Sequence, residues 1–329
     1  MYSEKQAAVI IAETAFNHEG DKEYLLKLVE EVSLTGVTHI KFQILIDYDE
    51  FVSLGSDTYE LTKDWCFDES QWKEILDYAE EKGLRLFLMP LDCAAVQFCL
   101  RSSVDFVEIH SVSFNDDVLK KAVFESLNHQ KLVFGLGGRT KEEVLALKGQ
   151  ITEDNLLLMH GFQAFPSKLK DVKLARLKYL RESFPESDLG YADHSAPETL
   201  DAIYSSMYAY HLGARFFEKH VSLCSDRTDA QSALTPVKLK DFVSEVRRFE
   251  SIVDDVDDVF DLGEKELIYR NRQKQVVASK SIKRGTLINE SDVALKMHTK
   301  KGAFTRINEV CGKIAISDYS IGDVILDGE

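Results

Sequence analysis

Short apolar segments alternate with amphipathic helical segments eight times in the first part of the sequence, and this order restricts the fold more than any other feature. Each apolar segment is nearly continuous, as expected of a strand that is covered on both faces. Eight strand–helix units in unbroken order predict an α/β fold, a (β/α)8 TIM barrel over residues 1–253, rather than a doubly wound sheet. The predicted strands are 8–13, 38–43, 84–89, 105–110, 131–136, 156–160, 190–195 and 216–221.

The character of the sequence changes after the predicted barrel. Residues 254–271 begin with an acidic run, and we interpret them as a linker. Residues 272–329 then show short β-type segments that are separated by glycines. A region of this size cannot bury much core by itself. The sequence therefore predicts a small second β domain that docks on another surface.

Composition excludes several classes of partner. Apolar residues make up 44% of the chain and the net charge is −16, which argues for a soluble globular protein and against binding to nucleic acid. We find no apolar run of the roughly 18 residues that a membrane span needs. Five scattered cysteines without paired spacing are typical of reduced thiols. We therefore expect a cytoplasmic protein without nucleic-acid or membrane partners.

Two of the predicted strands end in a histidine that has an acid close by. The seventh strand contains Asp193 and His194, and the eighth contains Glu218 and His220. Because one helical segment joins them, the two strands are expected to be parallel neighbours, with both histidines at the carboxyl edge where such folds carry their chemistry. Neutral imidazoles there can bind a divalent metal ion. The pair favours a metal site over the alternative of two unrelated histidines near strand ends.

Several stretches of the sequence resemble the sialic acid synthases, which condense phosphoenolpyruvate with an N-acetylated amino sugar. The stretch IIAETAFNHEGD (10–21) is similar to the first strand and loop of that family, and HIKFQ (39–43) is similar to its second-strand lysine motif. The two histidine strands, GYADHS and FFEKHV, resemble its metal-binding strands. The tail VVASKSIKRGTLINESDVALK (276–296) resembles the antifreeze-like (SAF) β-clip domain with which these enzymes end.

The resemblance implies a metal-assisted transferase that forms a carbon–carbon bond. His194 and His220 match the ligands of Mn²⁺ or Mg²⁺, and Glu13, Lys41 and Asp193 match catalytic positions. In the family the SAF domain crosses to the other subunit, so a domain-swapped homodimer is implied. The implied substrate-binding residues are Asn17, His18, Glu19, Ser111, Gln163 and Asp229, with Arg139 and Lys300 as candidate anion contacts.

The sequence departs from the family on the phosphoenolpyruvate side. Glu108 stands where the family has a lysine, and Ser113 stands where it has an acid. Ala192 and Leu136 replace hydroxyl-bearing residues of the family's pattern. A dianionic phosphate and a carboxylate need several cations and donors. The substitutions therefore predict weak or absent binding of phosphoenolpyruvate.

Two functions stay open at this point. The first is the family's synthase reaction, in which Arg139, Lys300 or Lys301 replaces the lost anion contacts. The second is a barrel without phosphoenolpyruvate chemistry, which either acts on another carbohydrate or binds without catalysis. Glu108 and His160, together with the two strand-end histidines, would allow a remodelled metal centre. The alternative for Glu108, His110 and His160 is a polar layer that is satisfied inside the barrel mouth.

Overall fold

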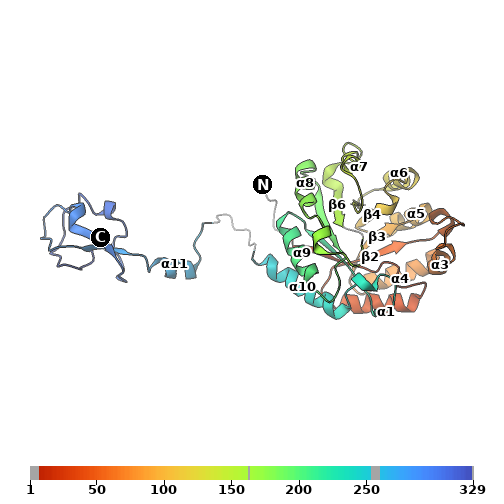
Figure 1. Ribbon diagram of the computed structural model, residues 1–329, viewed down its shortest axis with the longest axis horizontal. Coiled ribbons are helices and arrows are strands. Elements are labelled where there is room, and N and C mark those ends of the chain that lie inside the picture. The colour runs from red at the N-terminus through yellow and green to blue at the C-terminus, as the bar shows by residue number, and fades with distance from the viewer. Residues whose placement is uncertain (1–6, 162–163, 253–259, 328–329) are drawn as a thin grey trace. The chain divides into compact units, whose positions relative to one another are not determined.

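The computed structural model describes residues 7–161, 164–252 and 260–327, and it contains a closed barrel of eight parallel strands in chain order (Figure 1). Strand β8 pairs with β1 and closes the barrel. The predicted (β/α)8 fold is confirmed, and each predicted strand overlaps an observed one. The strands are β1 (Val9–Glu13), β2 (His39–Ile44), β3 (Arg85–Pro90), β4 (Phe106–Ile109), β5 (Lys131–Gly135), β6 (Leu156–Gly161), β7 (Asp188–Asp193) and β8 (Phe216–His220).

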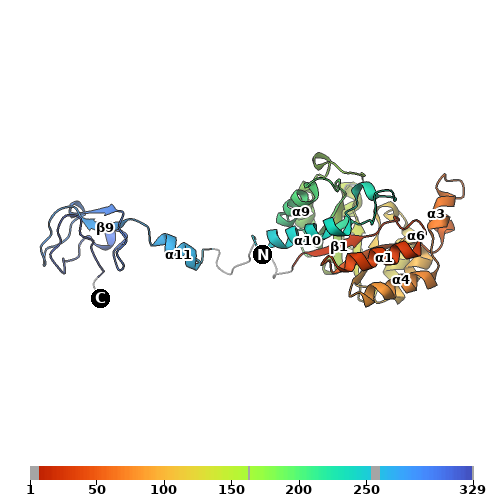
Figure 2. The same cartoon turned by 90° about the horizontal axis from the view of Figure 1, so that it is seen from below.

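Helices cover the outside of the barrel. Helices α1 and α4 pack side by side, and α1 also contacts α10 (Figure 2). Several helices begin at an aspartate or threonine whose side chain accepts a backbone N–H of the first turn, including Asp68, Asp92 and Thr235. The helices are α1 (Lys22–Ser33), α2 (Tyr48–Phe51), α3 (Tyr59–Trp65), α4 (Glu69–Glu81), α5 (Cys93–Arg101), α6 (Asp117–Ser126), α7 (Lys141–Leu145), α8 (Ala175–Ser183), α9 (Asp201–His211) and α10 (Pro236–Glu250).

Strand side chains divide between two layers because successive residues point to opposite faces of a sheet. One set points outward and packs against the helices in the main core, as Ile10 and Ala12 do in β1. The other set points into the barrel and forms a separate apolar layer. That inner layer contains Ile11, Phe87, Val133, Leu157, Met159, Ala192 and Phe216. Polar side chains on the same inward rows lie nearer the carboxyl ends of the strands, where they form the site described below.

The chain divides into two compact units, residues Met1–Asp254 and Asp255–Glu329. The second unit contains helix α11 (Glu264–Arg270), which falls within the predicted linker, and the antiparallel pair β9 (Gln275–Ala278) and β10 (Val293–Lys296). Residues 254–259 of the predicted linker lie outside the described residues. This unit has its own small core, formed by Val276, Ala278, Ile282, Ile288, Val293, Val310, Ala315, Tyr319 and Ile325.

Two further observations bear on the expected class of protein. Among the described residues we find no helix with the length and hydropathy that a bilayer crossing requires. All five cysteines are free thiols.

Candidate active site

A cavity of about 340 Å³ lies at the carboxyl ends of the barrel strands. The strand register places Glu13 of β1 beside Lys41 of β2 and beside His220 of β8, so these three residues lie at one level. Glu108 of β4 and Glu218 of β8 also line the cavity, each on the inward row of its strand. The remaining ionisable residues of its wall are His110, His194 and Asp229.

Lys41 is enclosed by carboxyl groups. Its Nζ lies 2.7 Å from Glu108 Oε2, 2.8 Å from Glu218 Oε2 and 3.6 Å from Glu13 Oε2. Burial alone would lower the pKa of Lys41, but the three neighbouring acids outweigh it and raise that pKa. Burial raises the pKa of Glu108, and the charge of Lys41 only partly offsets this. The ammonium group is therefore already ion-paired, and an incoming anion must compete with carboxylates for it.

Three side chains in the cavity can hold a metal ion together. Ligand atoms of Glu13, Glu218 and His220 lie within 4.8 Å of one another, and all three residues are buried. The rings of His194 and His220 are 4.8 Å apart between centroids. Nδ1 of each histidine is buried without a hydrogen-bond partner among the described residues. Two carboxylates and two imidazoles suit a divalent ion such as Mn²⁺, so the donor set fits the metal that the sequence predicts.

The protonation state of His194 also suits metal binding. Burial, together with the neighbouring His220, lowers the pKa of His194 to about 3. His194 is therefore neutral at pH 7, which is the form that binds metals. Phe165 packs on both rings, with centroid distances of 5.1 Å to His194 and 5.9 Å to His220. This contact holds the two imidazoles in place on the loop side of the cavity.

Asp193 lies outside the cavity, which differs from the catalytic role that the resemblance implies. Its carboxylate accepts hydrogen bonds from Tyr191 Oη at 2.9 Å and Ser195 Oγ at 2.6 Å, and it pairs with the buried ammonium group of Lys219. The strand alternation explains this, because Asp193 follows the inward Ala192 and so points to the helix side. We interpret Asp193 as a residue that positions its neighbour His194.

The loop after β1 supports the cavity wall without lining it. Asn17 donates to the carbonyl oxygen of Val221 through Nδ2. The imidazole of His18 stacks on Phe67, with centroids 4.7 Å apart. Glu19 accepts from both the backbone N–H and the hydroxyl of Thr228 at 2.8 Å. These three predicted substrate-binding residues therefore join the β1 loop to its neighbours, although Asn17 Oδ1 and His18 Nε2 are buried without a hydrogen-bond partner among the described residues.

The other predicted substrate-binding residues fall in different places. Ser111 and Asp229 line the cavity. Arg139 does not: it pairs with Glu143 at 3.3 Å and lines a separate cavity. Lys300 belongs to the second unit and not to the barrel unit. Gln163 lies outside the described residues.

The remodelled metal centre that includes His160 is not supported. His160 follows the inward Met159 in β6 and therefore points out of the barrel, where Nε2 donates to the carbonyl oxygen of Val172 at 2.8 Å. Glu108 faces the cavity but pairs with Lys41. The ligand set that the structure brings together is instead built around Glu13.

His110, expected in a polar layer of the barrel mouth, lines the cavity, whereas sequence reasoning missed Gln43 and Phe165. Gln43 donates to Glu13 Oε1 at 2.8 Å through Nε2, and so orients this acid. Its place two residues after Lys41 in β2 is the signal that could have identified it, because both residues share the inward face. Phe165 comes from the loop after β6, and strand periodicity does not place loop residues.

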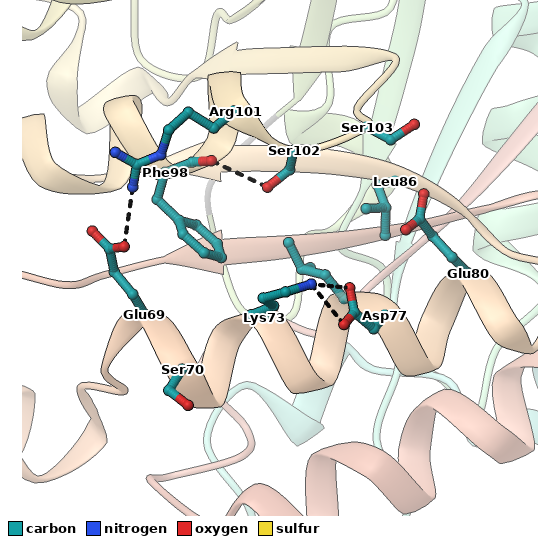
Figure 3. Close-up of a pocket in the computed structure, with 11 residues that line it drawn as sticks. Glu69, Ser70, Lys73, Asp77, Glu80, Leu86, Phe98, Arg101, Ser102 and Ser103 are labelled. Atoms are coloured by element: carbon teal, nitrogen blue, oxygen red, sulfur yellow. Dashed lines mark hydrogen bonds and ion pairs between the residues drawn. The ribbon is translucent and has the colours of Figure 1, made fainter.

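A second hollow lies on the outside of the barrel between α4 and α5 (Figure 3). Four of its charged residues form two ion pairs: Lys73 with Asp77 at 2.8 Å, and Arg101 with Glu69 at 3.0 Å. These pairs are exposed to solvent and contribute little free energy. We interpret this hollow as an ordinary groove between helices.

Comparisons with known proteins agree with this architecture. A model of the NeuB family matches residues 28–258, and a model of the SAF domain matches residues 274–328. The chain is 27% identical to the N,N'-diacetyllegionaminic acid synthase of Campylobacter jejuni, over 96% of this chain and 98% of that protein. It is 26% identical to a pseudaminic acid synthase of the same species, over 97% and 96%. The solved N-acetylneuraminic acid synthetase of Leptospira borgpetersenii superposes with a TM-score of 0.71 at 22% identity, covering 81% of this chain and 92% of that one.

Proposed function

Because the NeuB family model covers more than half of the sequence, the chain belongs to the NeuB family, and we propose that it is a metal-dependent enzyme that acts at the aldehyde end of an N-acylated amino sugar. The observation that carries this proposal is the cluster of Glu13, Glu218 and His220, whose ligand atoms lie within 4.8 Å of one another, with His194 beside it. Two relatives are named as an N,N'-diacetyllegionaminic acid synthase and a pseudaminic acid synthase, which supports the amino-sugar class of substrate.

The cavity provides the groups that such a reaction needs. A divalent ion bound by this cluster would act as a Lewis acid toward a carbonyl oxygen. Gln43 fixes the orientation of Glu13, and Phe165 covers the two imidazoles on one side. Ser111 and Asp229 offer a hydroxyl and a carboxyl group on the same wall, which suit the hydroxyl groups of a sugar. A polyol that is neutral overall therefore fits this cavity.

We propose that phosphoenolpyruvate is bound weakly or not at all. Among the described residues that line the cavity, Lys41 is the only one with a lysine or arginine side chain. Its ammonium group is already paired with Glu108 and Glu218. Ala192 and Leu136 add apolar surface where an anion would need donors. Binding of a trianion would leave charge without partners in a buried cavity, which is costly. The second substrate, which reacts with the sugar, is then a molecule that carries less negative charge than phosphoenolpyruvate.

A second candidate is the complete synthase reaction, in which phosphoenolpyruvate condenses with the amino sugar to a nine-carbon 2-keto sugar acid. Two observations favour it: Lys41 and Ser111 of the family's pattern are kept in the cavity wall, and the similarity to the named synthases spans nearly the whole chain. In this case Lys41 would exchange Glu108 for the substrate.

One pair of measurements separates the two candidates. The Mn²⁺-loaded full-length chain is titrated with phosphoenolpyruvate by calorimetry, and phosphate release is followed with N-acetylmannosamine and with 2,4-diacetamido sugars. We expect no saturable binding of phosphoenolpyruvate and no phosphate release, together with binding of one of the sugars. Micromolar binding with turnover would establish the synthase reaction instead.

A variant tests whether Glu108 is the cause. Glu108→Lys should strengthen the binding of phosphoenolpyruvate, because it restores a cation at the place where the family has one. Glu125→Lys is the matched control, since Glu125 is exposed on α6 and, among the residues that the structure describes, pairs only with Lys121 at 3.7 Å. Equal effects of the two substitutions would show that net charge, and not the cavity, changes the affinity.

We also propose that the protein works in the cytoplasm as a homodimer in which the second unit of one copy contacts the other. The family resemblance motivates this arrangement. The second unit supports it, because it exposes several apolar side chains that a partner surface could cover: Leu287, Met297, Ile314, Ile316 and Ile321. Removal of residues 255–329 should give a monomeric or aggregating barrel in light scattering, whereas an unchanged dimer would exclude the proposed role of this unit.

A further inference from the structure

A separate cavity of about 320 Å³ lies between helices α7 and α8, against the outer face of β6. Its walls are mainly apolar and include Leu136, Val144 and Leu180, with the ring of Tyr179. The volume falls within the range of about 300–1,000 Å³ that is typical of small-molecule sites. Because His160 lines this cavity from outside the barrel, the space is distinct from the candidate active site.

The cavity has an excess of positive charge. Arg139, Lys141 and Arg176 line it. Arg139 pairs with Glu143 at 3.3 Å, and the ammonium group of Lys141 lies 5.0 Å from the ring centroid of Tyr179. Within the described parts of the chain, the guanidinium group of Arg176 forms no ion pair or hydrogen bond. In a chain with a net charge of −16, this local excess of cations favours an anionic ligand.

A buried histidine lies on the floor of the cavity. His160 is 1% exposed, and its Nε2 donates to the carbonyl oxygen of Val172. Since a carbonyl can only accept, the proton is on Nε2 and the lone pair is on Nδ1. No hydrogen bond to Nδ1 from a described residue is present. Burial lowers the pKa of His160 to about 4, so the ring is neutral at pH 7 and keeps this acceptor.

We propose that the cavity between α7 and α8 is a second binding site, which takes a small organic anion with an apolar body. A phosphate or carboxylate of the ligand pairs with the guanidinium groups of Arg176 and Arg139. A ring or short apolar chain fills the space between Val144, Leu180 and Tyr179. A hydroxyl or amino group at the other end donates to His160 Nδ1. This assignment does not depend on the reaction in the barrel.

The test uses 4-hydroxyphenyl phosphate as a probe, because it has all three parts: the anion, the ring and the donor. Calorimetric titration of the full-length chain is done after removal of divalent metals, so that the probe cannot bind to an ion in the barrel. We expect saturable binding, weaker binding of phenyl phosphate, and still weaker binding of inorganic phosphate. A lack of saturable binding of 4-hydroxyphenyl phosphate would overturn the proposal.

Substitutions locate the binding. Arg176→Ala should weaken binding of the probe about tenfold or more, since it removes a charge-assisted contact. Lys178→Ala is the matched control on the same helix, because Lys178 is exposed and lies outside the cavity lining. Val144→Phe, which fills the cavity without a change of charge, should also abolish binding. Unchanged affinity in Arg176→Ala or in folded Val144→Phe would show that the probe binds elsewhere and would refute the site.

Discussion

Replacement of Lys219 by methionine is expected to destabilise the barrel strongly, because it leaves a buried carboxylate without its counter-charge. Lys219 and Asp193 are 0% and 1% exposed at their side chains and form an ion pair across β7 and β8. Loss of one partner of a buried pair costs about 3–5 kcal/mol in general. In the variant Asp193 keeps hydrogen bonds from Tyr191, Ser195 and Ser205, so we expect a cost at the lower end of this range.

The expected cost of Lys219→Met is therefore about 3 kcal/mol. For a barrel of this size each kcal/mol corresponds to a shift of roughly 2–4 °C in Tm, so the melting temperature should fall by roughly 6–12 °C. Burial raises the pKa of Asp193, but the charge of Lys219 outweighs it and lowers that pKa in the folded state. The Lys219–Asp193 pair therefore stabilises the fold fully above about pH 4, where an unfolded aspartate is ionised. This stabilisation is lost as the pH falls through the pKa of Asp193 in the folded state.

Urea unfolding and calorimetry at pH 7 measure this effect. Lys240→Met is the matched control, since Lys240 is exposed on α10 and forms no ion pair with a described residue. The double variant Lys219→Met, Asp193→Asn should recover part of the lost free energy of unfolding, because it removes the unpaired charge. A cost below about 1 kcal/mol for the single variant, or no recovery in the double variant, would refute the reasoning.

Three further predictions concern the site and its supports. His194→Ala should lose a bound divalent ion in elemental analysis while the exposed His211→Ala retains it, and full retention in both would exclude the metal site. Gly20→Ala should cost about 1–3 kcal/mol more than Gly149→Ala in urea unfolding, because both glycines have φ +78° but a Cβ at Gly20 would meet a backbone oxygen of α3 at 2.3 Å; equal costs would contradict this packing. Burial lowers the pKa of His18 to about 4, so the unfolded chain binds a proton at a higher pH than the folded chain does. His18 should therefore contribute roughly 2 kcal/mol to the loss of stability between pH 7 and pH 5, and His18→Gln should reduce that loss by this share.

The barrel could be predicted because its signal is repeated and local. Eight apolar segments with intervening helical segments leave little choice of topology, and cap residues such as Thr235 mark where helices begin. The pairing of His194 with His220 followed from the same order, since consecutive parallel strands present their carboxyl ends at one edge. These inferences needed only the sequence of elements along the chain.

Prediction of the face to which each strand side chain points needs strand alternation, which motif similarity does not supply. Asp193 and His194 are adjacent in sequence, yet one faces the helices and the other faces the cavity. Strict application of strand alternation from Ala192 would have placed both correctly. The same count in β6 would have removed His160 from the metal centre, because Met159 already faces inward.

The ion pairing of Lys41 depends on geometry that no local pattern contains. Glu13, Glu108 and Glu218 come from three different strands, and their distances to Nζ depend on the register of the closed barrel. The sequence could show that a carboxylate replaces a lysine at position 108. It could not show that this carboxylate would bind the remaining lysine.

Leu136 lines both the cavity at the barrel mouth and the cavity between α7 and α8. This one side chain therefore borders both a compartment rich in carboxylates and one that contains two guanidinium groups. A shorter residue at this position would add volume to both compartments at once. Variation at one position thus changes the size of two cavities of opposite charge, without any change in the candidate metal ligands.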